Sequence, residues 1–353
     1  MKKQNNKIIF ISPAHPNDGE VAYYDLALIR VYKTVNKYYN SRIIFDTEVN
    51  SESFCNYILS LNPSIIVINP YRYNLIDSVS FIKYIIKHIP DCIVILCGWY
   101  AESSYLRNYI RNTETLYLIC GEIEELLPDI IIKILTKKNL NPTEKKYFTR
   151  YSDNTSAHFY INKNYQPGDN TGNEQYLFQS QNIKTGWIEI SRGCRFACSF
   201  CIASSYNHKT YRKRPIKYIE KDIYELYERG VREFCILSSA INYDYVLMKN
   251  VFDIMKKLDE EVFLSGTIHP LFINKHTIPL IKSVRWRTMI MGLQTINPTA
   301  QIYINRRMEP ELFSEKILQI TDHHTPEVEI ILGLPGDNEE GFKKTVRYLL
   351  SLP

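Results

Sequence analysis

Three closely spaced cysteines are the residues of this chain best suited to chemistry. Cys194, Cys198 and Cys201 follow the spacing C-x3-C-x2-C, directly after an apolar run over 187–190 that predicts a short buried strand. Cysteine thiolates are the usual ligands of iron–sulfur clusters, and a cubane of four irons needs four ligands. Three cysteines would therefore leave one iron open, and an open metal position is where catalysis takes place. Gly193 would let the backbone leave the strand sharply beside such a bulky group.

Three other interpretations of these cysteines remain open. The i, i+4, i+7 spacing would also place them on one face of a helix as core residues, although Ser191 and Gly193 are poor helix formers. A structural zinc site would use the cysteines together with His208 or Cys235, but no second C-x2-C pair follows. Disulfides are the third alternative, which the spacing and the apparent compartment disfavour.

The cysteine segment resembles that of radical S-adenosylmethionine (SAM) enzymes, because aromatic Phe200 precedes the last cysteine and the motif follows a strand. The resemblance implies that Cys194, Cys198 and Cys201 hold a [4Fe–4S] cluster whose fourth iron is chelated by the amino and carboxylate groups of SAM. It also implies that one electron cleaves the SAM sulfonium, giving a 5′-deoxyadenosyl radical that abstracts hydrogen from a substrate. Phe200 would lie beside the adenine.

The composition predicts an ordinary globular protein. A chain of 353 residues suggests two domains, and 45% hydrophobic residues are enough for a large core. The net charge of +5 is spread out, so it gives no clear nucleic-acid signal and no sign of a membrane surface. No signal peptide and no apolar run of about 18 residues is evident, and the remaining cysteines resemble reduced core residues. We therefore expect a cytoplasmic protein.

Residues 1–136 predict a doubly wound α/β domain of the Rossmann-like kind. Short runs that are apolar throughout alternate with amphipathic segments, which is typical of a parallel sheet covered on both faces. Such a domain binds ligands outside the carboxyl ends of its strands. The predicted strands are 7–12, 42–45, 64–69, 91–97 and 117–120, and the predicted helices are 22–38, 51–61, 78–88 and 121–135.

The loops of this first domain resemble those of the cobalamin-binding domain that precedes many radical SAM cores. The matching landmarks are Gly98 after the fourth strand and Gly121-Glu122 after the fifth. The resemblance implies that these loops bind cobalamin, although the chain has no D-x-H-x-x-G motif and His15 is expected to be a loop residue. The alternative is a degenerate domain kept for packing or substrate recognition.

Residues 137–185 are rich in Asn, Lys, Thr, Tyr and Gln and predict a linker. Residues 186–353 predict repeated β/α units, and so a partial (β/α)6 barrel of the radical SAM type with its active face at the carboxyl ends of the strands. The predicted strands are 187–190, 233–238, 262–266, 288–294 and 328–334, and the predicted helices are 216–229, 245–258, 275–284, 311–322 and 338–350.

The resemblance to radical SAM enzymes extends over these units and assigns cofactor-binding roles at the strand ends. It places the SAM amino group at the segment from Ser238-Ser239 to Asn242 and matches Gly292-Leu293-Gln294 to the family's G-L-E/Q element. Arg306 corresponds to the arginine that often follows this element, and Gly333 to the glycine-rich turn that supports the adenine. Thr267 stands where the family has a carboxylate near the ribose.

Two further features of the sequence are a basic run and the place where the sequence ends. The basic run 208–215 is expected to be a solvated face, with the alternative that Lys209, Arg212 or Arg214 meets the SAM carboxylate, an anionic substrate or an acidic reductase. The sequence ends after the fifth predicted barrel helix, where a sixth strand would follow. We therefore expect either a missing segment or a partner that completes the barrel.

The leading functional hypothesis is a radical SAM enzyme of the cobalamin group, whose common reaction is methylation of an unactivated carbon. It would act on an unidentified small molecule or peptide and receive electrons from a reductase. No acid–base pair stands out, so no catalytic residue is assigned. The alternatives are a cobalamin-independent radical SAM tailoring enzyme, a methylthiotransferase-like tRNA modifier that needs a second cluster, and a non-catalytic scaffold that binds SAM or a metal.

Overall fold

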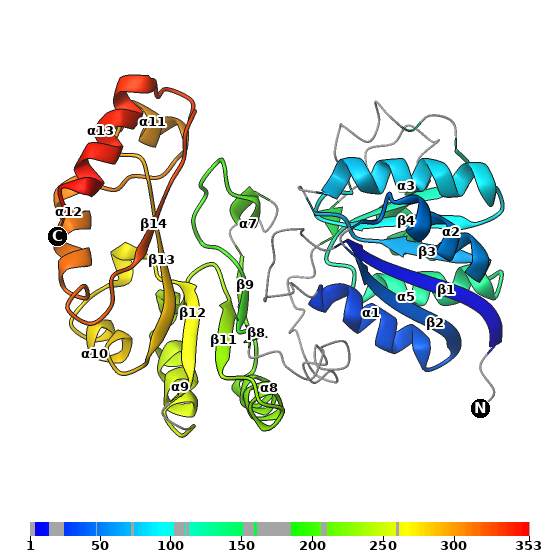
Figure 1. Cartoon of the computed structure of the whole chain (residues 1–353), viewed down its shortest axis with the longest axis horizontal. Helices are drawn as coiled ribbons and strands as arrows, with labels where there is room; N and C mark the ends of the chain where they lie inside the picture. The colour runs from blue at the N-terminus through cyan, green and yellow to red at the C-terminus, as the bar shows by residue number, and fades with distance from the viewer. Residues whose placement is uncertain are drawn as a thin grey trace. The chain divides into compact units, whose positions relative to one another are not determined.

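The computed structural model describes residues 4–13, 25–46, 48–71, 74–101, 110, 113–150, 159–160, 185–205, 210–258 and 261–352. The chain divides into two compact units, Met1–Asn162 and Lys163–Pro353 (Figure 1). Within the described part of the chain, none of the helices combines the length and the apolar content that crossing a membrane would require.

The first unit is built on a parallel sheet with the strand order β2-β1-β3-β4-β5. This confirms the predicted Rossmann-like arrangement. The strands are β1 (Gln4–Pro13), β2 (Tyr39–Asp46), β3 (Ile65–Ile68), β4 (Ile93–Gly98) and β5 (Leu116–Gly121). The helices are α1 (Leu26–Asn36), α2 (Glu52–Leu61), α3 (Leu75–His88), α5 (Leu126–Leu135) and α6 (Pro142–Tyr147).

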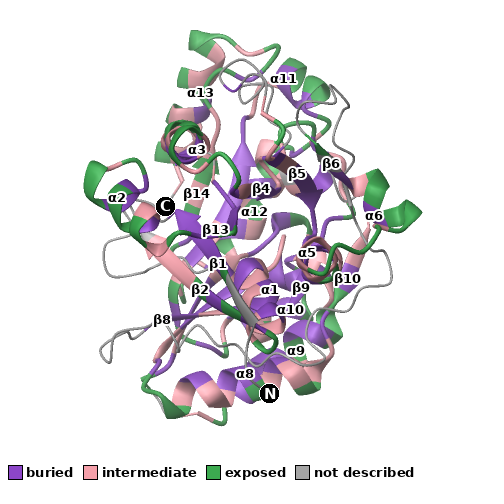
Figure 2. Cartoon of the chain, turned by 90° about the vertical axis from the view of Figure 1, so that its right-hand side faces the viewer, coloured by how far each residue is buried: buried purple, intermediate pink, exposed green. Residues whose placement is uncertain are grey.

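Both faces of this sheet are covered by helices, because alternate residues of each strand pack on opposite sides. On one face Ile66 and Ile68 pack with apolar residues of α2 and α3, and on the other Ile65 and Val67 pack with residues of α1 and α5. Figure 2 shows the outer surfaces of α2 and α6 as exposed, whereas β4 and β5 are largely buried. Strands buried on both faces explain why they are apolar throughout.

The first unit extends beyond residue 136, into the segment predicted as a linker. Helix α6 begins with a capping box between Asn141 and Glu144, and Glu144 also pairs with Lys133 of α5 at 2.5 Å. Strand β6 (Phe148–Arg150) then pairs antiparallel with β5, and β7 (Phe159–Tyr160) pairs with β5 as well. The rest of the predicted linker, 151–158 and 161–184, lies outside the described residues.

The second unit contains five parallel strands in the order β14-β13-β12-β11-β8, which confirms the predicted partial barrel. The strands are β8 (Thr185–Glu189), β11 (Glu233–Leu237), β12 (Phe263–Thr267), β13 (Trp286–Gln294) and β14 (Glu327–Ile330). The helices that follow them are α8 (Ile216–Glu228), α9 (Tyr245–Met255), α10 (Thr277–Ile281), α12 (Pro310–Leu318) and α13 (Glu339–Leu350).

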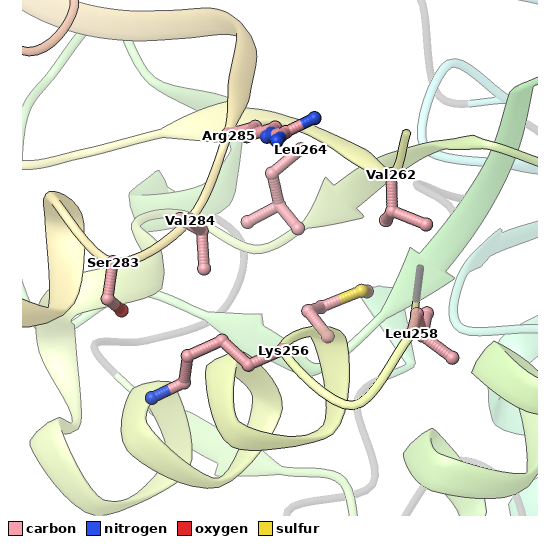
Figure 3. A pocket seen from close by; sticks show the side chains of 8 residues that line it. Lys256, Leu258, Val262, Leu264, Ser283, Val284 and Arg285 are labelled. Carbon is pink, nitrogen blue, oxygen red and sulfur yellow. The ribbon is translucent and has the colours of Figure 1, made fainter. Parts of the chain in front are cut away.

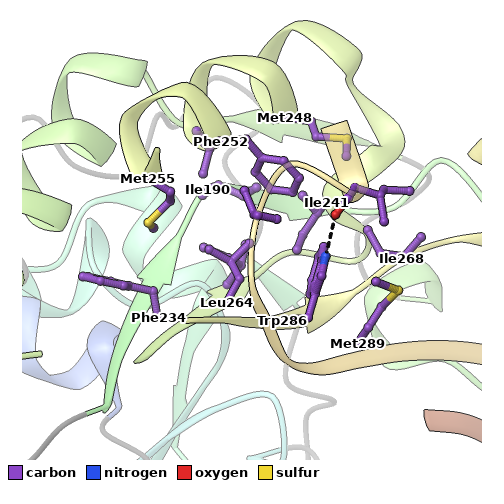
Figure 4. Close-up of a cluster of buried hydrophobic side chains, with 14 of the residues drawn as sticks. Ile190, Phe234, Ile241, Met248, Phe252, Met255, Leu264, Ile268, Trp286 and Met289 are labelled. Atoms are coloured by element: carbon purple, nitrogen blue, oxygen red, sulfur yellow. Dashed lines mark hydrogen bonds between the residues drawn. The ribbon is translucent and has the colours of Figure 1, made fainter. Parts of the chain in front are cut away.

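Apolar side chains from the strands and the helices form the core of this unit. In the close-up of Figure 4, Phe252 of α9 and Trp286 of β13 lie among Leu264 and several methionines. The indole Nε1 of Trp286 donates a hydrogen bond to the carbonyl oxygen of Ile281 at 2.9 Å, so this large side chain is buried without an unpaired polar atom.

Short elements that sequence periodicity did not predict follow several strands at their carboxyl ends. They are the hairpin of β9 (Ser191–Gly193) with β10 (Tyr211–Lys213), helix α7 (Ile202–Ser205), the 3-10 helices η4 (Ile241–Tyr243) and η5 (Pro270–Phe272), and helix α11 (Pro298–Tyr303). Strand β14 also ends at Ile330, earlier than expected, and Gly333 adopts a φ of +79° in the turn beyond it. Segments this short carry too few residues to show a period.

A cavity of about 180 Å³ lies at the opposite end of the second sheet from the cysteines (Figure 3). Its walls come from the end of α9 and from the amino ends of β12 and β13, including Met255, Val262 and Val284. In (β/α) barrels this end contributes to stability, whereas catalysis takes place at the carboxyl ends of the strands. The functional site is therefore expected at the cysteine end of the sheet.

Candidate functional site

The cysteine loop begins where the first strands of the second unit end. Strand β8 ends at Glu189, β9 ends at Gly193, and Cys194 follows directly. Gly193 has a φ of +80°, which confirms the expected sharp departure from the strand. Residues 194–201 are not helical, so the interpretation of the cysteines as one face of a helix was wrong.

Backbone and side-chain hydrogen bonds attach this loop to the end of α11. The Ser199 amide donates to the Ile304 carbonyl at 3.0 Å, and the Ser199 hydroxyl donates to the Tyr303 carbonyl at 3.2 Å. From the other side, Asn305 Nδ2 donates to the Ala197 carbonyl at 2.9 Å. The loop is therefore held by a segment more than a hundred residues further along the chain.

The geometry disfavours the alternatives of a disulfide or a zinc site. All eight cysteines are free, and Cys235 lies on β11, near Ser265 and Glu233. Across the described residues, no group of three His, Cys, Asp or Glu side chains could hold a single metal ion. His208, the other suggested zinc ligand, lies outside those residues. Each cysteine of a cubane binds its own iron, so a cluster does not need the three sulfurs to meet at one point.

Arg306 brings two predicted site elements together beside Cys198. Its Nη2 donates to the Gly292 carbonyl at 2.6 Å, and its Nη1 lies 3.9 Å from the Cys198 sulfur. A Cβ at Gly292 would overlap the side-chain amide of Gln294, so Gln294 folds back over that glycine. Burial raises the pKa of the Cys198 thiol, whereas the hydrogen bond and positive charge of Arg306 oppose that rise.

The predicted SAM segment after β11 lies against the cysteine loop. The Ser239 hydroxyl donates to the Gly193 carbonyl at 2.7 Å, and Ser238 Oγ lies 2.7 Å from Ser191 Oγ. Asn242 is buried, and its side chain bonds the backbone of His269 through both its oxygen and its nitrogen. The segment therefore lies beside the cysteine loop, whereas the Asn242 side chain is engaged by the protein's own backbone.

Sequence reasoning missed Tyr243, the residue that directly follows this segment. Its hydroxyl lies 3.1 Å from the Cys194 sulfur, and its ring contacts the rings of Phe196, His269 and Phe272. Burial, followed by the hydrogen bond with Cys194, raises the pKa of Tyr243 well above its ordinary value. The only signal in the sequence was an aromatic residue at the carboxyl end of a predicted barrel strand.

The expectation that the basic run 208–215 forms a solvated face was wrong for two of its arginines. Arg212 and Arg214 are 8% and 2% exposed. Arg214 pairs with the equally buried Asp222 of α8 at 2.5 Å, which attaches the β9–β10 hairpin to the barrel. Its charge is compensated within the protein, which argues against a role in binding an anionic ligand. Lys209 lies outside the described residues.

The remaining predicted SAM contacts lie on open parts of the structure. Phe200 is 39% exposed, and apart from the two chain neighbours of Gly333 no heavy atom of the described residues lies within 4 Å of where a Cβ on Gly333 would be. Thr267 ends β12, so no carboxylate occupies that strand end. Open backbone at Gly333 is compatible with the close approach of a ligand.

In the first unit, the strand order places a topological switch point between β1 and β3. Doubly wound sheets of the order 2-1-3-4-5 bind ligands outside this point. At this edge Asp25, the N-cap of α1, accepts hydrogen bonds from the Leu28 amide and from Asn69 Nδ2. Gly98 has a φ of +87°, and a Cβ there would overlap Asn69 Oδ1.

A second set of polar residues follows β5 at the same edge. Gly121 has a φ of +94°, and Glu122 is 5% exposed. The carboxylate oxygen Oε1 of Glu124 lies 3.5 Å from the Nη1 of Arg30 of α1. Burial raises the pKa of Asp25 to about 6, and the negative charge of Glu124 contributes to the rise. The hydrogen bonds from Leu28 and Asn69 to the Asp25 carboxylate oppose it. The predicted glycines thus lie at the carboxyl edge of the sheet, the edge outside which doubly wound sheets bind ligands. His15 and most of the loop after β1 lie outside the described residues.

Residues 188–349 match the family model of the radical SAM superfamily. The chain resembles the radical SAM methyltransferase TsrM from Kitasatospora setae, solved with cobalamin and a [4Fe-4S] cluster bound, with a TM-score of 0.77 at 14% identity. That match covers 99% of this chain and 73% of the other. The cobalamin-dependent SAM radical enzyme OxsB also has a TM-score of 0.77, at 11% identity, over 98% of this chain and 52% of the other. These likenesses extend the shared fold to both units.

Curated relatives are methylthiotransferases. The tRNA-2-methylthio-N(6)-dimethylallyladenosine synthase of Bdellovibrio bacteriovorus is 26% identical over 186 residues, covering 48% of this chain and 40% of the relative. The ribosomal protein uS12 methylthiotransferase RimO of a Nitratiruptor species is 26% identical over 204 residues, covering 49% of this chain and 44% of the relative. This chain thus spans less than half the length of either.

Proposed function

We propose that this chain, whose residues 188–349 match the family model of the radical SAM superfamily, catalyses cobalamin-dependent methylation of an unactivated carbon. One observation carries the proposal: the same chain combines two features. A doubly wound sheet with a topological switch point between β1 and β3 is followed by a partial barrel with a three-cysteine loop at the carboxyl ends of its strands. The fold shared with TsrM and OxsB over 98% or more of the chain supports it.

The residues of the second unit fit a [4Fe–4S] cluster and SAM. Cys194, Cys198 and Cys201 would hold the cluster, since thiolates are its usual ligands. The cluster would supply the electron for reductive cleavage of SAM. Arg306 Nε is buried and has no hydrogen-bond partner in the described part of the chain, so a SAM carboxylate beside it would satisfy a donor that the protein leaves unused.

The residues of the first unit fit a large ligand at the edge of the sheet. Gly98 and Gly121 both adopt positive φ where their strands end, so the backbone can turn sharply there, and at Gly98 the space of a Cβ is taken by the Asn69 side chain. Arg30, Glu124 and Asp25 form a polar layer beneath this edge. We propose that cobalamin lies outside this layer and that Glu122 lies near it.

The cluster assignment is tested by anaerobic reconstitution with iron and sulfide. The expected content is about four iron and four sulfide per chain. Cys198→Ala should lose most of this iron and the associated visible absorbance. The matched control is Cys235→Ala, which removes another buried free thiol of the same unit and should keep the cluster. Equal iron content in both variants would contradict the assignment.

The activity is tested with SAM that carries a deuterated methyl group, hydroxocobalamin and a chemical reductant in place of the proposed cellular reductase. We expect release of 5′-deoxyadenosine, spectral changes of bound cobalamin, and a labelled methyl group on added candidate substrates. Release of 5′-deoxyadenosine without any cobalamin binding would favour a cobalamin-independent radical SAM enzyme. If neither 5′-deoxyadenosine nor a labelled methyl product forms and no cobalamin is bound, a non-catalytic scaffold is favoured.

A methylthiotransferase is the second candidate, because the curated relatives bear that name. Such an enzyme would need a second cluster in the first unit. Cys55 lies in α2, Cys97 in β4 and Cys120 in β5, whereas Cys92 directly precedes β4 and does not, as expected, lie within a strand. All four are buried, and burial raises the pKa of Cys97 well above its ordinary value. Unlike the three cysteines that share the cysteine loop, these thiols lie in or beside α2, β4 and β5, so no single segment presents three of them to a cluster. About eight irons per reconstituted chain, instead of about four, would reverse our preference.

A further inference from the structure

Tyr243 is held rigidly with its hydroxyl on a sulfur of the cysteine loop. Its Oη lies 3.1 Å from Cys194 Sγ, and its side chain is almost wholly buried. The rings of Tyr211, Phe196 and Phe272 surround it at centroid distances of 5.9, 5.7 and 5.1 Å. A hydroxyl in such a setting has little freedom to turn to another partner.

The direction of this hydrogen bond follows from the chemistry of a metal ligand. As a free thiol, Cys194 could either donate to or accept from the tyrosine. As a cluster ligand it is a thiolate and carries no proton, so only the tyrosine can donate. The Phe196 amide also donates to this sulfur at 3.4 Å. Cys194 would then accept two hydrogen bonds, one of them from a removable side chain.

We propose that Tyr243 is a positioning residue that raises the reduction potential of the cluster by donating a hydrogen bond to Cys194. The inference rests on the cluster assignment within the proposed function. Tyr243 would keep its O–H bond, and no proton would move, when an electron from a reductant made the sulfurs of a bound cluster more negative. A fixed donor stabilises the reduced form more than the oxidised form, and hydrogen bonds to the sulfurs are known to set such potentials.

The test is a redox titration of the reconstituted full-length chain, followed by the electron paramagnetic resonance signal of the reduced cluster. Tyr243→Phe removes the hydroxyl and keeps the ring. Losing one hydrogen bond should lower the ratio of reduced to oxidised cluster at a given potential by up to roughly tenfold, which for one electron is about 59 mV. The matched control is Tyr211→Phe, which removes a hydroxyl from the neighbouring ring and should leave the potential unchanged.

A second variant keeps the test decisive if Tyr243→Phe fails to load a cluster. Replacing Tyr243 by 3-fluorotyrosine keeps the size of the ring and makes the hydroxyl a stronger donor, so the potential should move upwards. An unchanged potential in a loaded Tyr243→Phe protein, or in the fluorinated protein, would overturn the inference. If instead the unmodified chain loads no iron–sulfur cluster, the proposed function itself fails, so the two failures are distinguishable.

Discussion

Asn242 and His269 are joined by two reciprocal hydrogen bonds that link the ends of neighbouring barrel strands. Asn242 Nδ2 donates to the His269 carbonyl at 2.9 Å, and the His269 amide donates to Asn242 Oδ1 at 2.8 Å. One side chain thus satisfies two buried backbone groups, which would be costly to leave unpaired. This pair also fixes the segment that presents Tyr243 to Cys194.

Replacing Asn242 by alanine should destabilise the protein by about 2–4 kcal/mol, because two buried backbone groups lose their partners. Asn242→Asp keeps an acceptor for the His269 amide but cannot donate to its carbonyl, and it introduces a buried charge. Urea unfolding of the full chain would measure both effects. An alanine variant within about 0.5 kcal/mol of the parent would show that water replaces the side chain without cost.

Gly98→Ala should destabilise the first unit by more than about 2 kcal/mol, because positive φ strain is combined with overlap on Asn69. Gly230→Ala is the control, since Gly230 has a φ of +92° but, in the described part of the chain and apart from its two neighbours, no heavy atom lies within 4 Å of the added Cβ. Backbone strain alone should cost about 1 kcal/mol there. Thermal unfolding followed by circular dichroism would compare them, and equal losses would contradict the role of the overlap.

The buried pair of Arg214 and Asp222 predicts a large effect of a small change. Asp222→Asn leaves a buried guanidinium without its charged partner and should cost about 3 kcal/mol. The comparison is Asp253→Asn on the outer surface of α9, whose partners Lys249 and Lys256 are solvent-exposed, and which should change stability little. The denaturant midpoints of the two variants, compared with that of the parent, would measure the two losses of stability. Similar midpoints for Asp222→Asn and Asp253→Asn would refute the prediction.

His269 should make the folded state sensitive to acid. Burial lowers its pKa from 6.5 to about 3, and the positive charge of Arg306 adds to this effect. Between these values the unfolded chain binds a proton that the folded chain does not, so stability is lost as the pH falls from about 6.5 towards about 3, by up to about 1.4 kcal/mol per pH unit.

His269→Phe should keep an aromatic ring stacked on Phe196, where the ring centroids are now 4.7 Å apart, while removing the titrating group. The variant should lose less stability than the parent between pH 7 and pH 4, even if its stability at pH 7 is lower because the Leu271 amide loses its acceptor on the ring. Urea unfolding at several pH values would measure the difference in slope. Parallel curves for the two proteins would show that His269 does not titrate in this way.

The main architecture could be predicted from the sequence because its signals are local. Runs such as 64–69 and 91–97 are apolar throughout because both faces of their strands are covered, and the segments between them have the helical period. The cysteine spacing is equally local, since the three cysteines lie within eight residues. Gly193 and Gly98 were informative for the same reason, because a positive φ is a property of one residue.

Contacts between distant segments were decided only by the tertiary structure. Tyr243 meets Cys194 across 49 residues, and Arg306 meets Cys198 across 108. The prediction of a solvated basic face was wrong for Arg214 because the local charge density does not reveal its partner Asp222. The negative charge of Asp222 offsets the cost of burying the Arg214 guanidinium. Residue type and spacing determined what the loop can bind, whereas its hydrogen-bond donors depend on how the strand ends converge, a property of packing that no single stretch of sequence contains.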